Sequence, residues 1–483
     1  FFFHPHPATP DPLWSRGLGD VYKRQSIASV EKDKILFAGH AERYSRIKND
    51  PNLNDGIIED ALSYGEPDVI HWYESPILKN LRRLHAGQKW NFDRVKNKLK
   101  KLGIDKPIKY HLHHETHAAA GFYTSGKESA AVLVIDAIGE FDTASIWHGT
   151  PTGLKKIWSL RYPSSLGLFY SAITHRCGLK PNEEEYILMG MAAYGDPEKY
   201  YESMTLLLDQ NLHRGCRWWE YNTEDHFDFA ASAQKIYEEE FEVLLQKTRE
   251  LLPNEDSLVL MGGCALNCVA NNKALKYYED IWIMPNPGDA GSSLGAILAG
   301  TRQHVNWEGP YLGTNIARGY QLEEVLSHLE NGHLVGIAQG RAEFGPRALG
   351  NRSLLADPRG EHIKEKVNRI KRRQEFRPFA PIILEENVKD YFMMPVKTSP
   401  YMQYVVNSPH KDIPAVKHVD GTSRVQTVNK TQNPHIYTLL KAWKQRTGCP
   451  LLLNTSLNIK GQPMVNTWED AIEFEKKYQV KVF

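Results

Sequence analysis

The sequence contains few cysteines and no long apolar run. Its 483 residues include five cysteines and no Cys-x-x-Cys pair, and Cys264 and Cys268 stand four positions apart. So sparse and odd a set excludes a disulfide-stabilised secreted fold and indicates reduced thiols in a cytoplasmic protein. No stretch approaches the roughly 20 apolar residues that cross a bilayer, so we expect no membrane span.

An excess of charge of one sign is also missing. The net charge is +1, which excludes a general attraction to nucleic acid or to an acidic surface. Charge is uneven locally, because residues 78–109 hold eleven Lys or Arg against two Asp. This stretch is either a solvated helical face or a funnel for phosphate-bearing substrates. The length and the apolar content of 41% indicate a soluble globular protein of roughly two to four domains.

The first 25 residues, FFFHPHPATPDPLWSRGLGDVYKRQ, lack an initiator Met, a signal-peptide core and a clear periodicity. From Ser26 the chain changes to strand-like alternation, SIASVEKDKILFAGH. Our hypothesis is that residues 1–25 are out-of-frame or foreign sequence joined to a true coding region, and we exclude them from the fold prediction.

The remaining chain alternates strands and helices. Residues 130–135 and 143–148 are predicted strands, and residues 240–252 are a predicted amphipathic helix. Residues 257–276 and 281–300 each predict a strand, a Gly-bearing turn and a helix. Strands that run through such turns into helices are typical of α/β proteins. The pattern restarts near residue 310, so a domain boundary is expected within 308–318.

The stretch HLHHETHAAAG, residues 111–121, holds four histidines. Side chains four apart share one face of a helix, which favours His113 with His117 as a pair. His114 with His117 is the second choice, and the zinc-protease pattern H-E-x-x-H is absent. The alternative is an ordinary histidine-rich helix start.

Two aspartates follow predicted strands, Asp136 after VLVI and Asp289 in the turn NPGDAGSS. Carboxylates at strand ends commonly meet at one edge of an α/β sheet. With two imidazoles they would form a mixed nitrogen and oxygen site, which suits Fe(II), Mn or Zn better than Ca. Each aspartate could instead cap the turn or helix that follows it.

Phosphate-binding features occur in both halves of the sequence. Gly262 and Gly263 precede a helix start and expose backbone amides, although close strand–helix packing explains such glycines equally well. The C-terminal third holds a dense set of cations whose guanidinium forks match phosphate oxygens. Either they form surface salt bridges or, together with two polar residues after a predicted strand, they form a polyphosphate site: Arg341, Arg347, Arg352, Lys371, Arg373, Arg377 and Arg424, with Asn454 and Ser456.

Five segments resemble the signatures of the O-carbamoyltransferase family, which includes nodulation-factor and antibiotic carbamoyltransferases. They are HHETHAAAGFY, EEEYILMGMAAYGDP, GRAEFGPRALGNRSLLADPR, HVDGTSRVQTV and LLLNTSLNIKGQPMVNT. The resemblance spans nearly the whole chain from about residue 26. It implies an α/β fold with an actin-like ATPase (duplicated RNase H-like) domain over 26–312 and a YrdC-like α/β domain over 313–483.

The resemblance also implies site residues and a reaction. Iron would be held by His113, His117, Asp136 and Asp289, and Lys48 would contact the carbamoyl group. ATP, with Mg, and carbamoyl phosphate would give carbamoyl adenylate and pyrophosphate in the C-terminal domain, where Arg347 and its neighbours balance phosphate charge. The N-terminal domain would then transfer the carbamoyl group to a hydroxyl of a sugar or natural product, with adenosine against the turns that contain Gly262, Gly263 and Asn267. A homodimer is compatible with this reading.

One departure from the family pattern concerns the start of the chain. The family begins with His-Asp-Ser-Ser, and counting back from Lys48 aligns its His-Asp with Lys23 and Arg24, while Ser26 fits the last Ser. The base expected to activate the acceptor and a first strand are therefore missing from the sequence as given.

Two other functions are alternatives to this one. A tRNA-modifying threonylcarbamoyl transferase is disfavoured because GRAEFGPRALGNRS is typical of the O-carbamoyl group. A non-catalytic nucleotide- or RNA-binding protein would use the basic stretch 78–109 and would bind RNA with a strong salt dependence. The complete sets of metal ligands and arginines disfavour that alternative.

Overall fold

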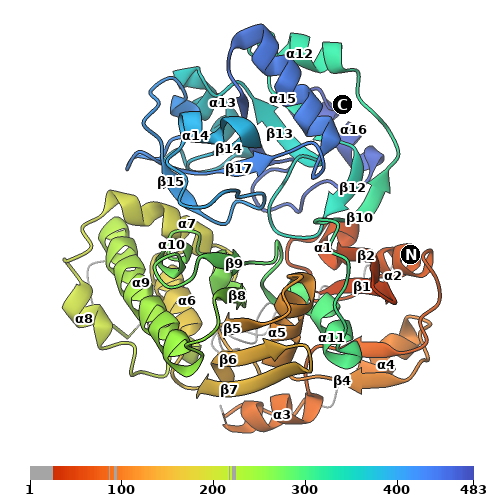
Figure 1. Ribbon diagram of the computed structural model, residues 1–483, viewed down its shortest axis with the longest axis vertical. Coiled ribbons are helices and arrows are strands. Elements are labelled where there is room, and N and C mark those ends of the chain that lie inside the picture. The colour runs from red at the N-terminus through yellow and green to blue at the C-terminus, as the bar shows by residue number, and fades with distance from the viewer. Residues whose placement is uncertain (1–24, 86, 92–94, 217, 220–224) are drawn as a thin grey trace, which may run out of the picture.

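The computed structural model describes residues 25–85, 87–91, 95–216, 218–219 and 225–483, and its chain forms two α/β lobes. Figure 1 shows the N-terminal lobe below and the C-terminal lobe above it. The predicted α/β architecture with two domains is confirmed. The hypothesis about residues 1–25 falls almost entirely outside the described residues, so Lys23 and Arg24 have no structural account.

The centre of the N-terminal lobe is a five-stranded sheet in the order β7-β6-β5-β8-β9. Strands β5, β6 and β7 form an antiparallel meander, and β8 and β9 run parallel to β5. All six residues of β5 are buried, as its continuous apolar sequence AAVLVI predicts. The bounds are β5 Ala130–Ile135, β6 Asp142–Thr150, β7 Gly153–Arg161, β8 Ser257–Met261 and β9 Asp280–Trp282.

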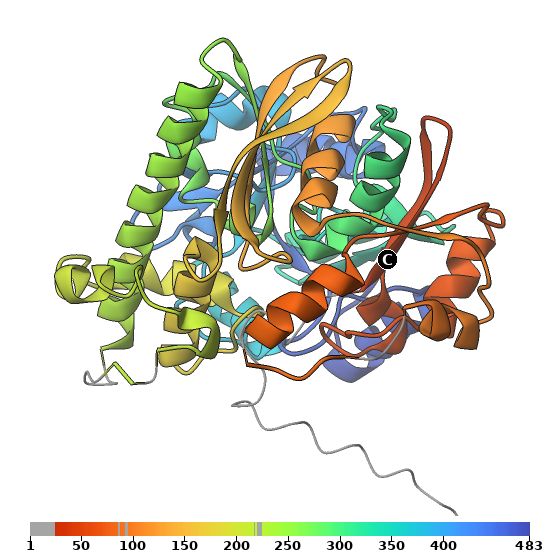
Figure 2. The same cartoon turned by 90° about the horizontal axis from the view of Figure 1, so that it is seen from below.

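Alternate residues of β5 belong to two hydrophobic cores, one on each face of the sheet, because successive side chains of a strand point to opposite faces. Val132 and Val134 pack with α5 (His113–Thr124) and α11 (Ser292–Thr301). Leu133 and Ile135 pack with α6 (Leu166–Arg176) and α9 (His226–Leu251). Figure 2 shows the sheet between α9 on one side and α5 with α11 on the other.

The rest of the N-terminal lobe consists of short elements. Two small sheets precede the central one, an antiparallel pair β1–β2 and a parallel pair β3–β4. Their bounds are β1 Ser26–Glu31, β2 Lys34–His40, β3 Ile70–Trp72 and β4 Ile108–Tyr110. The helices are α1 Ala41–Ser45, α2 Asp55–Leu62, α3 Pro76–His85, α4 Val95–Lys101, α7 Glu185–Met191, α8 Tyr201–Thr205 and α10 Asn271–Ala274. None of the described helices combines the length and the apolar composition needed to cross a bilayer.

The C-terminal lobe is built on a second five-stranded sheet in the order β11-β13-β18-β14-β17. Neighbouring strands are antiparallel except for β14 and β17. Helix α15 (Pro434–Thr447) covers one face, and α13 (Glu361–Lys371) with α16 (Trp468–Tyr478) covers the other. The remaining bounds are β10 Tyr311–Ile316, β11 Val335–Ala338, β12 Gly340–Glu343, β13 Arg352–Ala356, β14 Ala380–Leu384, β15 Val405–Asn407, β16 Thr422–Arg424, β17 Gln426–Val428, β18 Leu451–Ser456, α12 Leu322–Glu330 and α14 Val388–Tyr391.

The predicted local elements are largely present, with two shifts in bounds. The helix predicted over 240–252 is the second half of the longer α9, whose first half carries Ala, Ser and Gln and has a weaker apolar signal. The division predicted between 312 and 313 falls inside β10, and β10 pairs with β12 of the C-terminal lobe. The boundary therefore lies just before β10, still within the predicted range 308–318.

Two arginines of the segment GRAEFGPRALGNRS have structural roles. Arg352 is fully buried, and its guanidinium donates to five carbonyls, those of Thr314, Gln339, Gly340, Asn351 and Asn466. Arg341 donates to the carbonyls of Gly313 and Leu312 and to that of Leu36 in the N-terminal lobe. Both side chains saturate backbone acceptors where the lobes join and are not available to a phosphate.

We predict that Arg352→Leu destabilises the protein by about 3–5 kcal/mol, because it leaves several buried carbonyls without donors. The measurement is urea denaturation followed by fluorescence. Arg359→Leu is the matched control, since Arg359 pairs with Asp357 on the surface and should cost less than about 1 kcal/mol. Equal losses in the two variants would contradict the structural role of Arg352.

Candidate metal centre and active-site cavity

Helix α5 begins at His113 and places His113 and His117 one turn apart, as the spacing predicts. The two Nε2 atoms are 3.1 Å apart and both rings are fully buried. His114 turns to the other side, where its Nδ1 lies 2.8 Å from the Ser145 hydroxyl. The second-choice pair, His114 with His117, is therefore not formed.

The two predicted aspartates converge on this pair from loops after two strands. Asp136 directly follows β5, and Asp289 opens the short 3₁₀ turn Asp289–Gly291 after β9. The Nε2 atom of His113 lies 3.0 Å from Asp136 Oδ2 and 3.2 Å from Asp289 Oδ1. One ligand atom from each of the four residues lies within 4.8 Å of the other three.

The four residues fit a transition-metal ion. Two nitrogens bound tetrahedrally at about 2.05 Å are about 3.3 Å apart, close to the separation of the two imidazoles. The buried Oδ1 atom of Asp289 accepts no hydrogen bond within the described part of the chain. Burial opposes the charged form of Asp136, but hydrogen bonds with His113 and His117 hold the pKa of its carboxyl well below the usual range. An anionic, mixed nitrogen and oxygen site suits Fe(II), Mn or Zn.

Glu140 fixes the start of α5 and was not found by the sequence analysis. Its buried carboxylate accepts the backbone N–H of His113 at 3.0 Å and that of Ser75 at 2.8 Å. A carboxylate at a helix N-terminus is favoured by the helix dipole. Because both partners are backbone groups, no spacing of side chains in the sequence points to this role.

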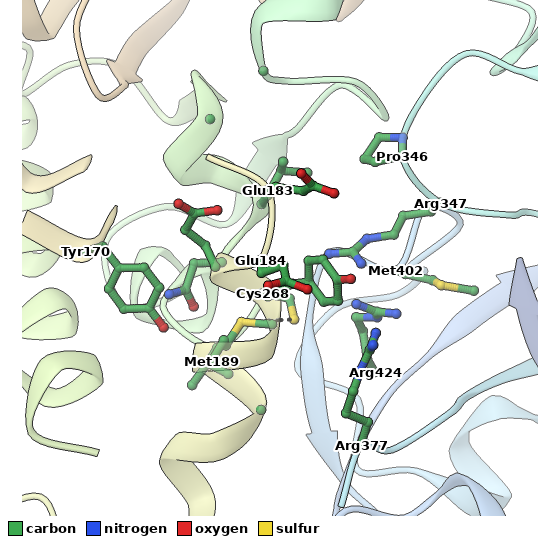
Figure 3. Close-up of a pocket in the computed structure, with 18 of the residues that line it drawn as sticks. Tyr170, Glu183, Glu184, Met189, Cys268, Pro346, Arg347, Arg377, Met402 and Arg424 are labelled. Carbon is green, nitrogen blue, oxygen red and sulfur yellow. Dashed lines mark hydrogen bonds between the residues drawn. The ribbon is translucent and has the colours of Figure 1, made fainter. Parts of the chain in front are cut away.

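A single cavity of about 1060 Å³ lies between the lobes and reaches both candidate sites. Asp136, Gly263 and Asp289 line it from the N-terminal lobe, and Figure 3 shows Arg347, Arg377 and Arg424 on the wall formed by the C-terminal lobe. Of the other predicted residues, the following also line this cavity: Lys48, Asn267, Lys371, Arg373, Asn454 and Ser456.

The cations on the C-terminal wall are held close together in a buried environment. Burial, followed by the charge of Arg424, lowers the pKa of Arg347 to about 9. Burial and the neighbouring arginines lower the pKa of Arg373 and hold that of Lys371 well below its usual range. The ammonium of Lys371 donates to the hydroxyl of Ser456 at 3.0 Å. Bound phosphate oxygens would relieve this repulsion.

The facing wall is polar and acidic. Glu183, Glu184 and Tyr170 lie opposite the arginines in Figure 3, and Cys268 contacts Met189 on the same wall of the N-terminal lobe. The hydroxyl of Tyr170 donates a hydrogen bond of 2.7 Å to the side-chain carbonyl of Gln234. The same carbonyl also accepts a hydrogen bond from the side-chain amide of Asn267. Of these residues the sequence analysis assigned only Asn267 to the site, although Glu183, Glu184 and Met189 lie within the signature EEEYILMGMAAYGDP. Gln234 lies in the middle of α9 with no motif around it.

Comparison with known proteins assigns the family. The model described as "Carbamoyltransferase C-terminus" matches residues 326–483, and "Carbamoyltransferase N-terminus" matches residues 73–223 and 199–298. The chain belongs to the carbamoyltransferase family. It is therefore a carbamoyltransferase enzyme, as the sequence motifs predicted.

Three relatives show how far the similarity extends. An uncharacterised protein of Synechocystis, sll1178, is 33% identical over 93% of this chain and 92% of its own length. Nodulation protein NolNO of Sinorhizobium fredii is 32% identical over 95% of this chain and 77% of its own. The 3'-hydroxymethylcephem-O-carbamoyltransferase of Amycolatopsis lactamdurans is 26% identical over 92% and 93%.

Three residues predicted to bind nucleotide do not line the cavity of this carbamoyltransferase. Arg341 and Arg352 donate their hydrogen bonds to backbone carbonyls, as described above. Gly262 has φ 92°, and a Cβ there would lie 2.0 Å from the carbonyl oxygen of Ile135. Gly262 is thus required by close packing of the turn on β5, the alternative left open by the sequence, whereas its neighbour Gly263 does line the cavity.

Lys48 lines the same cavity as Asp136 and Asp289, two of the candidate metal ligands. Lys48 Nζ is 3.1 Å from the carboxylate of Glu42, and both residues line the cavity. The Ser26 hydroxyl donates to the carbonyl of Ala290, next to Asp289. The start of β1 therefore lies beside Asp289, one of the four candidate ligands.

We predict that His117→Ala lowers metal content from about one Fe(II)-class ion per chain to a small fraction, because it removes one of four ligands. Elemental analysis after anaerobic reconstitution is the measurement. His148→Ala is the control, since that imidazole pairs with Glu255 outside the cluster. Full occupancy in a His113→Ala/His117→Ala double variant would show that these histidines are not ligands.

Proposed function

We propose that this enzyme is an ATP-dependent O-carbamoyltransferase that makes carbamoyl adenylate from carbamoyl phosphate and ATP and passes the carbamoyl group to a hydroxyl. One observation carries the proposal. A single cavity is lined by the two aspartates of the metal cluster and by the cations of the C-terminal lobe. A phosphate-rich substrate and a site for acyl-type transfer would then share one enclosed volume.

The adenylate-forming step is assigned to the C-terminal wall. Arg347, Arg373 and Arg424 would neutralise the negative charge that develops on the phosphates of ATP, which would bind together with Mg. Lys371, held by Ser456 and Asn458, would fix one phosphate oxygen. The overall stoichiometry of this step is that carbamoyl phosphate, ATP and water give carbamoyl adenylate, phosphate and pyrophosphate.

The transfer step is assigned to the N-terminal wall. A metal ion held by His113, His117, Asp136 and Asp289 would supply Lewis-acid polarisation of a carbonyl when bound. Lys48, oriented by Glu42, would donate a hydrogen bond to the carbamoyl group. The turn at Gly263 and the amide of Asn267 would face the adenosine. The oxygen of the acceptor hydroxyl would bond to the carbamoyl carbon and lose its proton to water, while the bond between the carbamoyl carbon and the phosphate oxygen breaks and AMP leaves.

The acceptor class follows from the relatives. The cephem enzyme is named for transfer to a hydroxymethyl oxygen and NolNO for nodulation, so a hydroxyl of a sugar or natural product is the acceptor we propose. We also propose that the enzyme works in the cytoplasm, where its five cysteines, all free, would stay reduced.

The finer fold assignment is part of the same proposal. The order β7-β6-β5-β8-β9, a meander followed by two parallel strands, supports an RNase H-like unit of the actin-like ATPase class. The small sheets β1–β2 and β3–β4 would belong to its partner unit, and the C-terminal sheet to a YrdC-like domain.

We predict that the two steps can be separated by substitution. Arg347→Ala and Arg424→Ala should each slow carbamoyl-phosphate-dependent exchange of pyrophosphate into ATP by about 10²–10³-fold, as expected when a charge-stabilising donor is removed. Asp136→Asn should leave this exchange intact and abolish carbamoyl transfer to the acceptor. Labelled pyrophosphate measures the first step.

The control is Arg359→Ala, whose surface guanidinium lies outside the cavity. Normal exchange in both arginine variants, together with lost exchange in Asp136→Asn, would reverse the allocation of the two steps between the lobes.

A further inference from the structure

Two tyrosines of the signature EEEYILMGMAAYGDP, Tyr186 and Tyr194, have no role in the two steps proposed above. Tyr186 lies in the first turn of α7, and Tyr194 ends the 3₁₀ turn Ala192–Tyr194 that follows this helix. Both belong to the N-terminal lobe, yet they contact two successive residues of the C-terminal lobe, Phe376 and Arg377. Tyr186 is 40% exposed and lines the cavity.

The ring of Tyr186 lies against the guanidinium of Arg377. The Cζ atom of Arg377 is 4.7 Å from the centroid of that ring. The negative face of an aromatic ring attracts a guanidinium, and more strongly where burial excludes water. Burial lowers the pKa of Arg377, whereas Tyr186 favours its charged form. The contact therefore holds the side chain and helps it to stay charged.

A ring holds an arginine without neutralising it. A carboxylate partner would cancel the charge and occupy the N–H donors, whereas the face of a ring leaves them available to a phosphate. Figure 3 shows the side chains of Arg347, Arg377 and Arg424 converging on one region of the cavity. The Nε atom of Arg424 is buried and has no hydrogen-bond partner among the described residues. These features are those expected of a site that binds an anion.

Arg373 and Arg377 both stack on a ring, but the rings come from different lobes. The Cζ atom of Arg373 lies 3.8 Å from the centroid of Phe379, in its own lobe. Arg373 also donates to the side-chain oxygen of Asn368 at 2.6 Å and to the carbonyl of Pro378 at 3.0 Å. The C-terminal lobe thus fixes Arg373 by itself, whereas the aromatic partner of Arg377 is supplied across the cavity.

Tyr194 holds the backbone next to Arg377. Its hydroxyl donates to the carbonyl of Phe376 at 3.1 Å, and the two ring centroids are 5.9 Å apart. The ring of Phe227, at the start of α9, packs on the same side chain at 5.7 Å. The N-terminal lobe therefore contacts both the side chain of Arg377 and the backbone from which it projects.

We infer that Tyr186 is a positioning residue for the phosphate-binding step, because its ring directs the Arg377 guanidinium of the opposite lobe into the cavity. The anion site is then complete only where the two lobes meet. This inference rests on the proposed function, in which the cations of the C-terminal wall bind the phosphates of the substrates.

Calorimetric binding of inorganic pyrophosphate to the full chain tests the inference. Tyr186→Leu removes the ring and should weaken binding by about tenfold, the size of one cation–π contact in a partly desolvated site. Tyr186→Phe keeps the ring and should lose less than about threefold. Arg377→Leu should weaken binding at least as much as Tyr186→Leu. The double variant Tyr186→Leu/Arg377→Leu should match Arg377→Leu within about twofold, because the ring acts through that guanidinium.

The matched control is Tyr437→Leu. It removes a ring that lies 5.9 Å from the ammonium of Lys441 in the C-terminal lobe, outside the cavity, and should leave pyrophosphate binding unchanged. The thermal unfolding midpoint of Tyr186→Leu should stay close to that of the unaltered chain, because the side chain is 40% exposed.

Three results would overturn the inference. The first is additive losses in the double variant, and the second is no pyrophosphate binding by the unaltered chain. The third is a Tyr186→Leu variant that loses affinity for ATP but not for pyrophosphate, since the ring would then contact the nucleotide base. Failure of the proposed function looks different. Pyrophosphate would bind in a manner that depends on Tyr186, but carbamoyl phosphate would promote no exchange of pyrophosphate into ATP.

Discussion

Two buried imidazoles, the buried carboxylate of Asp136 and the partly buried carboxylate of Asp289 share one small volume at the ends of the central strands, and several elements of the N-terminal lobe meet there. Helix α5 must start at His113 for its imidazole to reach Asp136 and Asp289, and Glu140 fixes that start by accepting the His113 N–H. The end of β5 and the turn after β9 must come to the same edge, which the parallel arrangement of β5, β8 and β9 ensures. A bound cation would balance the two carboxylates in this buried environment.

The excess of negative charge at the two carboxylates faces an excess of positive charge on the opposite wall of the cavity. Several cations lie close together on the C-terminal wall, where their mutual repulsion is destabilising, and an anion bound between them would offset it. Hydrogen bonds between the lobes hold them in this relation. Arg46 donates to the carbonyl of Met464, and Asn271 and Asn272 donate to carbonyls of the segment 403–405. The lobe junction therefore keeps the candidate cation site and the candidate anion site open to one cavity.

Much of this arrangement is predictable from sequence, for identifiable reasons. The pair His113 and His117 follows from helical spacing, and strand-end carboxylates such as Asp136 follow from α/β topology. Sequence patterns could not separate the arginines that line the cavity from those that have a structural role. Arg341, Arg347 and Arg352 lie within twelve residues, yet only Arg347 lines the cavity, since the other two are taken by backbone carbonyls contributed largely by distant segments. The roles of Glu140 and Gln234 depend on long-range partners in the same way.

The central claim is that carbamoyl adenylate passes from one wall to the other inside a single molecule. Mixing two inactive variants tests it most directly. Arg347→Ala should lack the first step and Asp136→Asn the second, so a mixture can transfer the carbamoyl group only if the intermediate diffuses between molecules. We predict that an equimolar mixture is as inactive as either variant alone, as judged by mass spectrometry of the carbamoylated acceptor. Restored transfer in the mixture would contradict the shared cavity as the route.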